Sequence, residues 1–134
     1  MWRVGVKMVR EKPWFGVGPG RVAGSYTTYL SPADPVPAYH GHLHNNIVQL
    51  AAEFGLPTLG AALLFTAMIV RELRKQCRLA IDRDQKFLCR AALLGLFAFA
   101  IAGMFDYTYG HSLGLILLGF VVLSPLAPTS KVAE

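Results

Sequence analysis

The sequence predicts an all-α fold, the C-terminal portion of a polytopic membrane protein with a periplasmic loop and about three transmembrane helices. The 134 residues are 54% apolar and only 16% charged, with a mean hydropathy of +0.42. This composition is too apolar for an ordinary soluble domain of this size. The basic residues, which give a formal net charge of +5, fall between apolar runs as in membrane loops. We expect the lipid bilayer as a partner and no nucleic acid.

Residues 2–12 predict a short amphipathic helix that Pro13 ends. Arg3, Lys7 and Arg10 share one face of this helix, which favours a solvated or membrane-surface position. The first residues lack the apolar segment and cleavage site of a signal peptide. The spacing of Cys77 and Cys89 supports neither a zinc ribbon nor a redox motif.

A glycine-rich stretch follows, in which Gly16, Gly18 and Gly20 flank Pro19. It predicts either a plain tight turn or a loop whose backbone N–H groups bind an anion. Residues 21–39 predict an irregular loop that lies on the surface or presents aromatic faces to a sugar. Its aromatic residues and prolines are Tyr26, Tyr29, Tyr39, Pro32, Pro35 and Pro37.

An amphipathic helix is predicted from residue 47 to 54, with Asn46 as its N-cap and Gln49 as the capping partner. One stripe is apolar (Ile47, Leu50, Ala51, Phe54) and the opposite one is polar (Asn46, Gln49, Glu53). His44 then precedes a helix N-terminus, where the helix dipole favours a neutral imidazole and a bound anion.

Three membrane spans are predicted, at residues 57–76, 88–106 and 112–127. The apolar run from residue 57 to 70 is about 21 Å long as a helix, so it must continue to cross a hydrocarbon core of about 30 Å. Lys and Arg outnumber acids in the loop at about 77–90, which predicts a cytoplasmic loop. The resulting organisation is a periplasmic region 1–56, a membrane region 57–128 and a cytoplasmic tail 129–134.

The short link between the last two spans carries a polar cluster of Asp106, Tyr107, Tyr109 and His111. An antiparallel pair of helices returns this cluster to the face of the membrane that holds His44. The tyrosines fit an interfacial aromatic belt. A carboxylate here sits at an interface or against a partner, so Asp106 is a candidate site residue.

The chain resembles the O-antigen ligase family. His44-Asn45, nine residues, Gly55, two residues and Thr58 match the family's motif, and Pro13 to Gly20 is similar to its Pro-x-x-Gly-x-Gly loop. Trp2 stands where the family often has a Trp. Family members are polytopic inner-membrane glycosyltransferases that move an undecaprenyl-diphosphate-linked glycan onto an acceptor at the periplasmic face.

The resemblance implies a role for each motif residue. His44 is the expected general base and Asn45 the residue that orients it; Glu53 and Asp106, which are not motif positions, are further candidates for an orienting role. The candidate ligands of the diphosphate are Arg3, Arg10 and Arg21, and the candidate structural residues are Gly16, Gly18, Gly55 and Thr58. The resemblance implies neither a metal nor another cofactor.

The expected acceptor is lipid A core oligosaccharide, and the expected location is the bacterial inner membrane. An O-antigen polymerase or a protein O-oligosaccharyltransferase has the same motifs. Family members are much longer and carry further arginines upstream. We therefore expect this chain to be a C-terminal piece that is catalytically incomplete alone or works with a separate N-terminal half.

Two other functions fit part of the pattern. His40, His42 and His44 alternate, and on an extended strand they would point three imidazoles to one side as a zinc or copper site. A non-catalytic membrane subunit is the other possibility. The nine-residue spacing to Gly55 favours the glycosyltransferase, because a metal site requires neither that glycine nor the intervening helix start.

Overall fold

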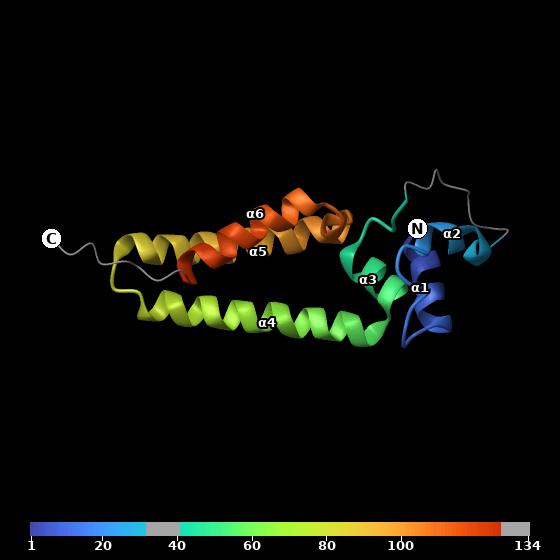
Figure 1. The fold of residues 1–134 in the computed structure, drawn as a ribbon, viewed down its shortest axis with the longest axis horizontal. Helices are drawn as coiled ribbons and strands as arrows, with labels where there is room; N and C mark the ends of the chain where they lie inside the picture. Colours follow the sequence, from blue (N-terminus) through green and yellow to red (C-terminus); the bar gives the residue numbers. More distant parts are fainter. Residues whose placement is uncertain (32–40, 127–134) are drawn as a thin grey trace.

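A computed structural model of the chain describes residues 1–31 and 41–126, and all regular structure in those ranges is helical. The predicted all-α class is therefore confirmed. Helices α4, α5 and α6 run along the long axis of the molecule, while α1, α2 and α3 gather at one end (Figure 1). In chain order the elements are α1 (Trp2–Glu11), α2 (Val22–Ser25), η1 (Tyr26–Tyr29), α3 (Asn46–Phe54), α4 (Leu56–Leu79), α5 (Arg83–Phe105), η2 (Thr108–Gly110), α6 (Ser112–Leu123) and η3 (Ser124–Leu126).

Helices α4 and α5 are both long and apolar enough to cross a membrane. They have 24 and 23 residues, which corresponds to about 35 Å of helix each. Only 6% of the apolar window of α4, and 22% of that of α5, is buried inside the molecule. Side chains such as Phe65, Leu94 and Phe97 are exposed instead. A core helix of a soluble protein would bury these groups, whereas lipid can cover them.

The third apolar segment, Ser112–Leu126, follows the predicted span of residues 112–127 as far as the described residues reach, but its last turn is a 3-10 helix. Helix α6 has 12 residues, or about 18 Å, and a 3-10 turn with Pro125 follows it. Proline has no N–H to continue the helical hydrogen bonds, which explains why the α-helix ends here. The predicted tail 129–134 lies outside the described residues.

The predicted basic loop at about 77–90 is mostly helical. Helix α4 continues to Leu79 and α5 begins at Arg83, so only residues 80–82 connect them. The side chain of Asp82 caps α5 by accepting a hydrogen bond from the Gln85 N–H at 3.4 Å. Arg78 in the last turn of α4 complements the helix dipole. These end effects extend both helices into a segment that charge alone suggested was a loop.

A small apolar core holds the N-terminal helices together. The predicted amphipathic helix is confirmed as α1, which buries Val4 and Met8 and leaves Arg3 and Arg10 exposed. It crosses α3 closely at Gly5, where an added Cβ would overlap the Val48 side chain. Other members of this core are Val17, Val22, Tyr26, Leu43 and Ala52. Four residues singled out in the loop, Pro32, Pro35, Pro37 and Tyr39, lie outside the described residues, as does His40.

Candidate functional site

Helix α3 carries the predicted amphipathic pattern, but its polar stripe is buried and not solvated. Asn46, Gln49 and Glu53 are 6%, 3% and 8% exposed, while the apolar Ile47 is 47% exposed. Buried polar groups require hydrogen-bond partners. Each of the three polar side chains has a partner in another part of the chain, so the polar stripe connects α3 to its surroundings.

The N-cap of α3 is Asn45 and not Asn46 as predicted. Asn45 is extended, and its side-chain oxygen accepts from the Val48 N–H at 2.9 Å, while its Nδ2 donates to the Met104 carbonyl at 2.9 Å. Asn45 was expected to orient the His44 imidazole. Its side chain instead caps α3 and hydrogen-bonds to the end of α5.

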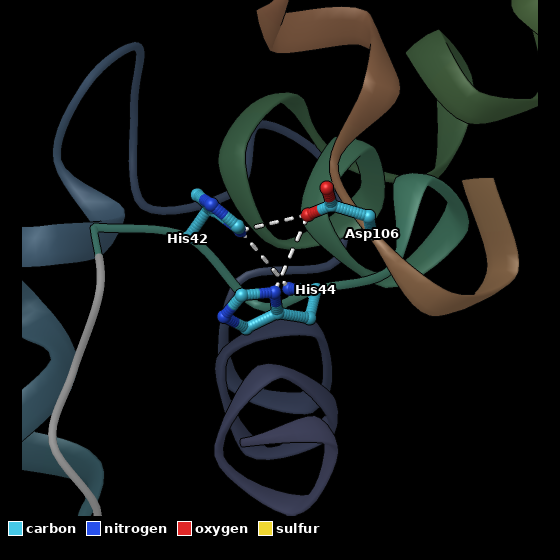
Figure 2. Close-up of side chains that lie close together, drawn as sticks. All are labelled: His42, His44 and Asp106. Carbon is cyan, nitrogen blue, oxygen red and sulfur yellow. Dashed lines mark hydrogen bonds and ion pairs between the residues drawn. The ribbon is translucent and has the colours of Figure 1, made fainter. Parts of the chain in front are cut away.

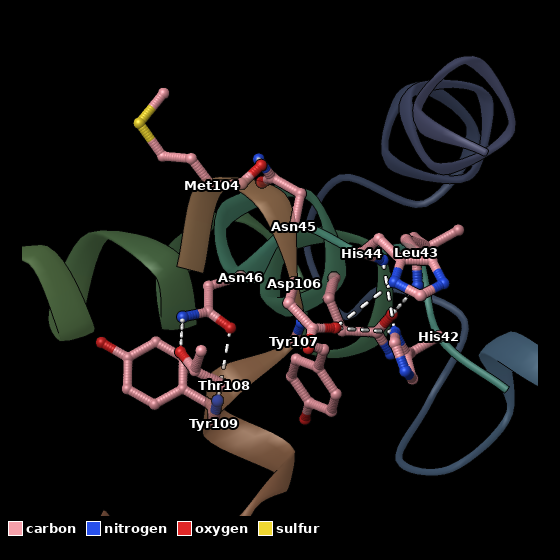
Figure 3. Close-up of polar contacts among 11 residues, drawn as sticks. His42, Leu43, His44, Asn45, Asn46, Met104, Asp106, Tyr107, Thr108 and Tyr109 are labelled. Atoms are coloured by element: carbon pink, nitrogen blue, oxygen red, sulfur yellow. Dashed lines mark hydrogen bonds and ion pairs between the residues drawn. The ribbon is translucent and has the colours of Figure 1, made fainter. Parts of the chain in front are cut away.

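Asn46 occupies the first helical position and makes a second tie to the link after α5. Its Nδ2 donates to Thr108 Oγ1 at 2.6 Å, and its oxygen accepts from the Tyr109 N–H at 3.3 Å (Figure 3). Gly103 makes this approach possible, since a Cβ there would overlap the Asn46 amide. Sequence patterns could not locate these partners, because they lie about sixty residues further along the chain.

Glu53 was expected to orient the histidine, and the structure places it in a different network. Its Oε1 accepts from the Gly20 N–H at 2.5 Å, and its Oε2 accepts from Gln49 Nε2 at 2.9 Å. Gln49 Oε1 in turn accepts from the Leu43 N–H at 2.9 Å. This chain of hydrogen bonds fixes the backbone next to His44 and joins it to the glycine-rich loop.

The glycine-rich loop docks on the end of α3 through its backbone amides. The Val17 N–H donates to the Ala52 carbonyl at 2.8 Å, and the Gly18 N–H to the Glu53 carbonyl at 3.0 Å. These amides satisfy carbonyls that a helix end leaves unpaired. The side chain of Thr58 also donates to a carbonyl of this end, that of Phe54, at 3.2 Å.

Gly16 and Gly55 let the two backbones meet. Both have positive φ, +63° and +88°. A Cβ on Gly16 would overlap the Ala52 carbonyl, and one on Gly55 would overlap the Trp14 carbonyl. The two glycines, which lie far apart in sequence, therefore belong to one backbone contact.

His44 lies beside Asp106 at the junction of this N-terminal unit and α5 (Figure 2). Its Nδ1 is 3.3 Å from Asp106 Oδ1, and His42 Nδ1 is 3.8 Å from the same oxygen. The two imidazole centroids are 4.1 Å apart. His44 has φ +52°, an uncommon conformation that directs its ring back toward His42 and Asp106. The predicted proximity of Asp106 and His44 is therefore seen in the geometry.

Asp106 is an anion at neutral pH. The Tyr107 N–H donates to its Oδ1 at 2.7 Å, and this bond, the hydrogen bond to His44 and the charges of His42 and His44 lower the pKa of Asp106 despite some desolvation. A carboxylate can only accept, so His44 Nδ1 carries the proton in this contact. The neutral tautomer then has its acceptor lone pair on Nε2.

Two further residues, His42 and Tyr107, lie beside His44 and Asp106, although neither was a predicted catalytic or orienting residue. His42 accepts from the His44 backbone N–H at 3.4 Å. The Tyr107 ring is 5.9 Å from that of His42, and burial, together with the negative charge of Glu53, raises the pKa of the Tyr107 hydroxyl. Tyr107 is therefore a neutral hydroxyl donor. In the sequence, the alternation of His42 with His44 was the pattern that could have placed His42 at this site.

The candidate diphosphate ligands lie on α1 and at the start of α2. Arg3, Lys7 and Arg10 line an open pocket of about 320 Å³ on the outer face of α1. Lys7 Nζ donates to the Tyr29 carbonyl at 3.1 Å. Arg21 is exposed at the N-cap of α2, next to Gly18. The shared cationic face predicted for α1 is present.

The comparison with protein families gives a match over residues 1–65, to the family described as O-antigen ligase. This segment is of the O-antigen ligase family. The match includes His44, Gly55 and Thr58, whereas Asp106 lies beyond it. No curated protein matches the chain. O-antigen ligases are proteins of ligase and glycosyltransferase type, and together with the two apolar helices the family indicates a membrane protein.

Proposed function

We propose that the chain carries the catalytic base of an O-antigen ligase-like glycosyltransferase. The donor is an undecaprenyl-diphosphate-linked glycan, and the acceptor is a hydroxyl of lipid A core oligosaccharide at the periplasmic face of the bacterial inner membrane. The observation that supports this most is the 3.3 Å contact of His44 with Asp106, made by the histidine of the family motif.

The base is Nε2 of His44. Asp106 accepts the hydrogen bond from Nδ1–H and so holds the ring in the tautomer that presents a lone pair at Nε2. The acceptor hydroxyl gives its proton to Nε2 as its oxygen attacks the anomeric carbon. The bond from that carbon to the diphosphate breaks, and its electron pair leaves with the diphosphate. One direct displacement inverts the anomeric centre.

The departing diphosphate needs cationic partners, because its negative charge grows as the bond breaks. Arg3 and Arg10 on α1, and Arg21 at α2, are the candidates in this chain. Guanidinium groups bind phosphate oxygens through paired hydrogen bonds, and this role requires no metal. The exposed position of these side chains fits a ligand that arrives from the membrane surface.

Substitution of the histidines tests the proposal. We expect His44→Ala to reduce glycan transfer by about 10²- to 10⁴-fold, the usual contribution of a positioned general base. His42→Ala should cost much less, because it removes no proton acceptor of the reaction. Transfer of labelled glycan is measured in a membrane reconstitution that includes the expected N-terminal half, and insertion and donor binding are checked separately.

His44→Asn distinguishes catalysis from a structural role. Asparagine tolerates positive φ and can still form a hydrogen bond with Asp106, but it cannot take a proton. Transfer at a near-normal rate by His44→Asn would end the assignment of the base. A panel of acceptors, including a growing glycan chain and a Ser/Thr peptide, distinguishes a ligase from a polymerase or a protein glycosyltransferase.

A further inference from the structure

Three potential metal-ligand atoms converge at the candidate site. The ligand atoms of His42, His44 and Asp106 lie within 4.8 Å of one another, and two of the separations are 3.3 Å and 3.8 Å. In a tetrahedral zinc site, bonds of about 2.0 to 2.2 Å place neighbouring ligand atoms about 3.3 to 3.6 Å apart. The side chains are 24%, 36% and 49% exposed, so their rings have room for the small adjustment that is needed.

The chemistry of the three side chains also suits zinc. Two imidazoles and one carboxylate form an N/O ligand set that zinc accepts, and three protein ligands leave a fourth position for water. The backbone that carries them is held on both sides. Leu43 N–H is bound by Gln49, and Asp106 N–H donates to the Ala102 carbonyl at 3.0 Å.

We propose that His42, His44 and Asp106 bind one Zn²⁺ ion and that this ion inhibits glycan transfer. This site differs from the alternation of His40, His42 and His44, because its third ligand comes from the link after α5. The inhibition rests on the proposed function. A zinc ion on Nδ1 of His44 leaves the proton of the neutral ring on Nε2, so Nε2 cannot take the proton of the acceptor hydroxyl.

Zinc binding is tested without reference to activity. The chelator-stripped chain in detergent micelles is titrated with Zn²⁺ against a chromophoric chelator, and Co²⁺ is added separately to record the absorption of a tetrahedral site. We expect one zinc per chain, and an affinity lower by at least about 100-fold in His42→Ala and Asp106→Ala, since a direct ligand should matter more than an outer partner. His111→Ala is the matched control, because it removes an exposed imidazole at the N-cap of α6.

Asp106→Cys separates ligation from folding. A thiolate is a good zinc ligand, so Asp106→Cys should retain the binding that Asp106→Ala loses. Unchanged zinc affinity in Asp106→Ala would overturn the site, and so would loss of binding in His40→Ala alone.

Inhibition is measured as the ratio of transfer with zinc to transfer with chelator within each variant. For the wild type and for His111→Ala we expect transfer with zinc to be at least about tenfold slower than transfer with chelator, because zinc blocks a positioned base. An equal rate with and without bound zinc would refute the inhibition. If zinc binds as described and the wild type, reconstituted with the expected N-terminal half, transfers no glycan, the metal site stands and the proposed function fails.

Discussion

Gly55 adopts φ +88° and ψ 170°, a combination that is essentially restricted to glycine. Its Cα also faces the Trp14 carbonyl, so no side chain fits. The glycine of the family motif therefore serves a backbone contact between the end of α3 and the glycine-rich loop. A side chain at this residue would push apart the two segments whose hydrogen bonds join them.

We expect Gly55→Ala to destabilise the packing of α1 on α3 by more than about 2 kcal/mol, because conformational strain and a backbone clash add. Gly20→Ala is the control for strain alone, since Gly20 has φ +67° but open space around it, and it should cost about 1 kcal/mol. Thermal unfolding in detergent, followed by the near-ultraviolet signal of Trp2 and Trp14, compares the two variants. Equal losses would mean that the close contact contributes nothing.

The carboxyl of Asp106 should titrate below its ordinary value of 3.8. Its lowered pKa means that the folded state favours the anion, so this contribution to stability is complete above the ordinary pKa and is lost as the pH falls through the folded value. We expect the tie between residues 44 and 106 to be intact at neutral pH and to weaken only below about pH 4. Carbon-13 NMR of the carboxyl measures this pKa. His44→Ala should raise it, and a wild-type value at or above the ordinary one would contradict the geometry.

Helix α3 shows that the apolar stripe of a helix does not by itself predict which of its faces are buried. The period of its apolar residues predicted a helix at the correct position. The period could not show that the polar side is buried, because the partners of Asn46 and Gln49 are other segments of the chain. The shift of the cap from Asn46 to Asn45 has the same origin, since Thr108 and Tyr109 occupy the amide of Asn46.

Asn45→Ala should cost about 2 kcal/mol. About 1 kcal/mol comes from the lost N-cap and about 1 from the hydrogen bond to the Met104 carbonyl. Hydrogen exchange of the Val48 amide reports the cap directly, because its acceptor is removed. Thr58→Ala serves as control, since it removes an exposed bond to the carbonyl four residues earlier and should change stability by less than about 0.5 kcal/mol. Unaltered Val48 exchange in Asn45→Ala would exclude the capping role.

For the molecule as a whole, composition and charge predicted an all-helical chain, and the motif spacing predicted the family that residues 1–65 match. The candidate pair of His44 and Asp106 was accessible to sequence reasoning because two antiparallel helices return the chain to the same face. The contribution of His42 was accessible only in part, because the turn at His44 is a backbone conformation that composition does not encode. The third predicted span, residues 112–127, corresponds to α6 and the 3-10 turn η3 that follows it as far as the described residues reach.

The orientation in the membrane remains a prediction that labelling can test. We expect residues 1–45 to be periplasmic and the connection at residues 80–82 to be cytoplasmic, because the basic residues gather around that connection. In a Cys-free background, a membrane-impermeant reagent should label a cysteine at position 42 from outside and miss one at position 84. The reverse pattern would place the candidate site on the wrong side of the membrane.

The two side chains of the candidate site are made at different times during translation. His44 and Asp106 are 62 positions apart, with α4 and α5 between them. The ribosome makes His44 before either helix, so the histidine can contact its carboxylate partner only after both helices have been made. A nascent chain halted after α4 thus has the motif without the site. Under the proposed function, glycan transfer therefore requires both α4 and α5 to be complete.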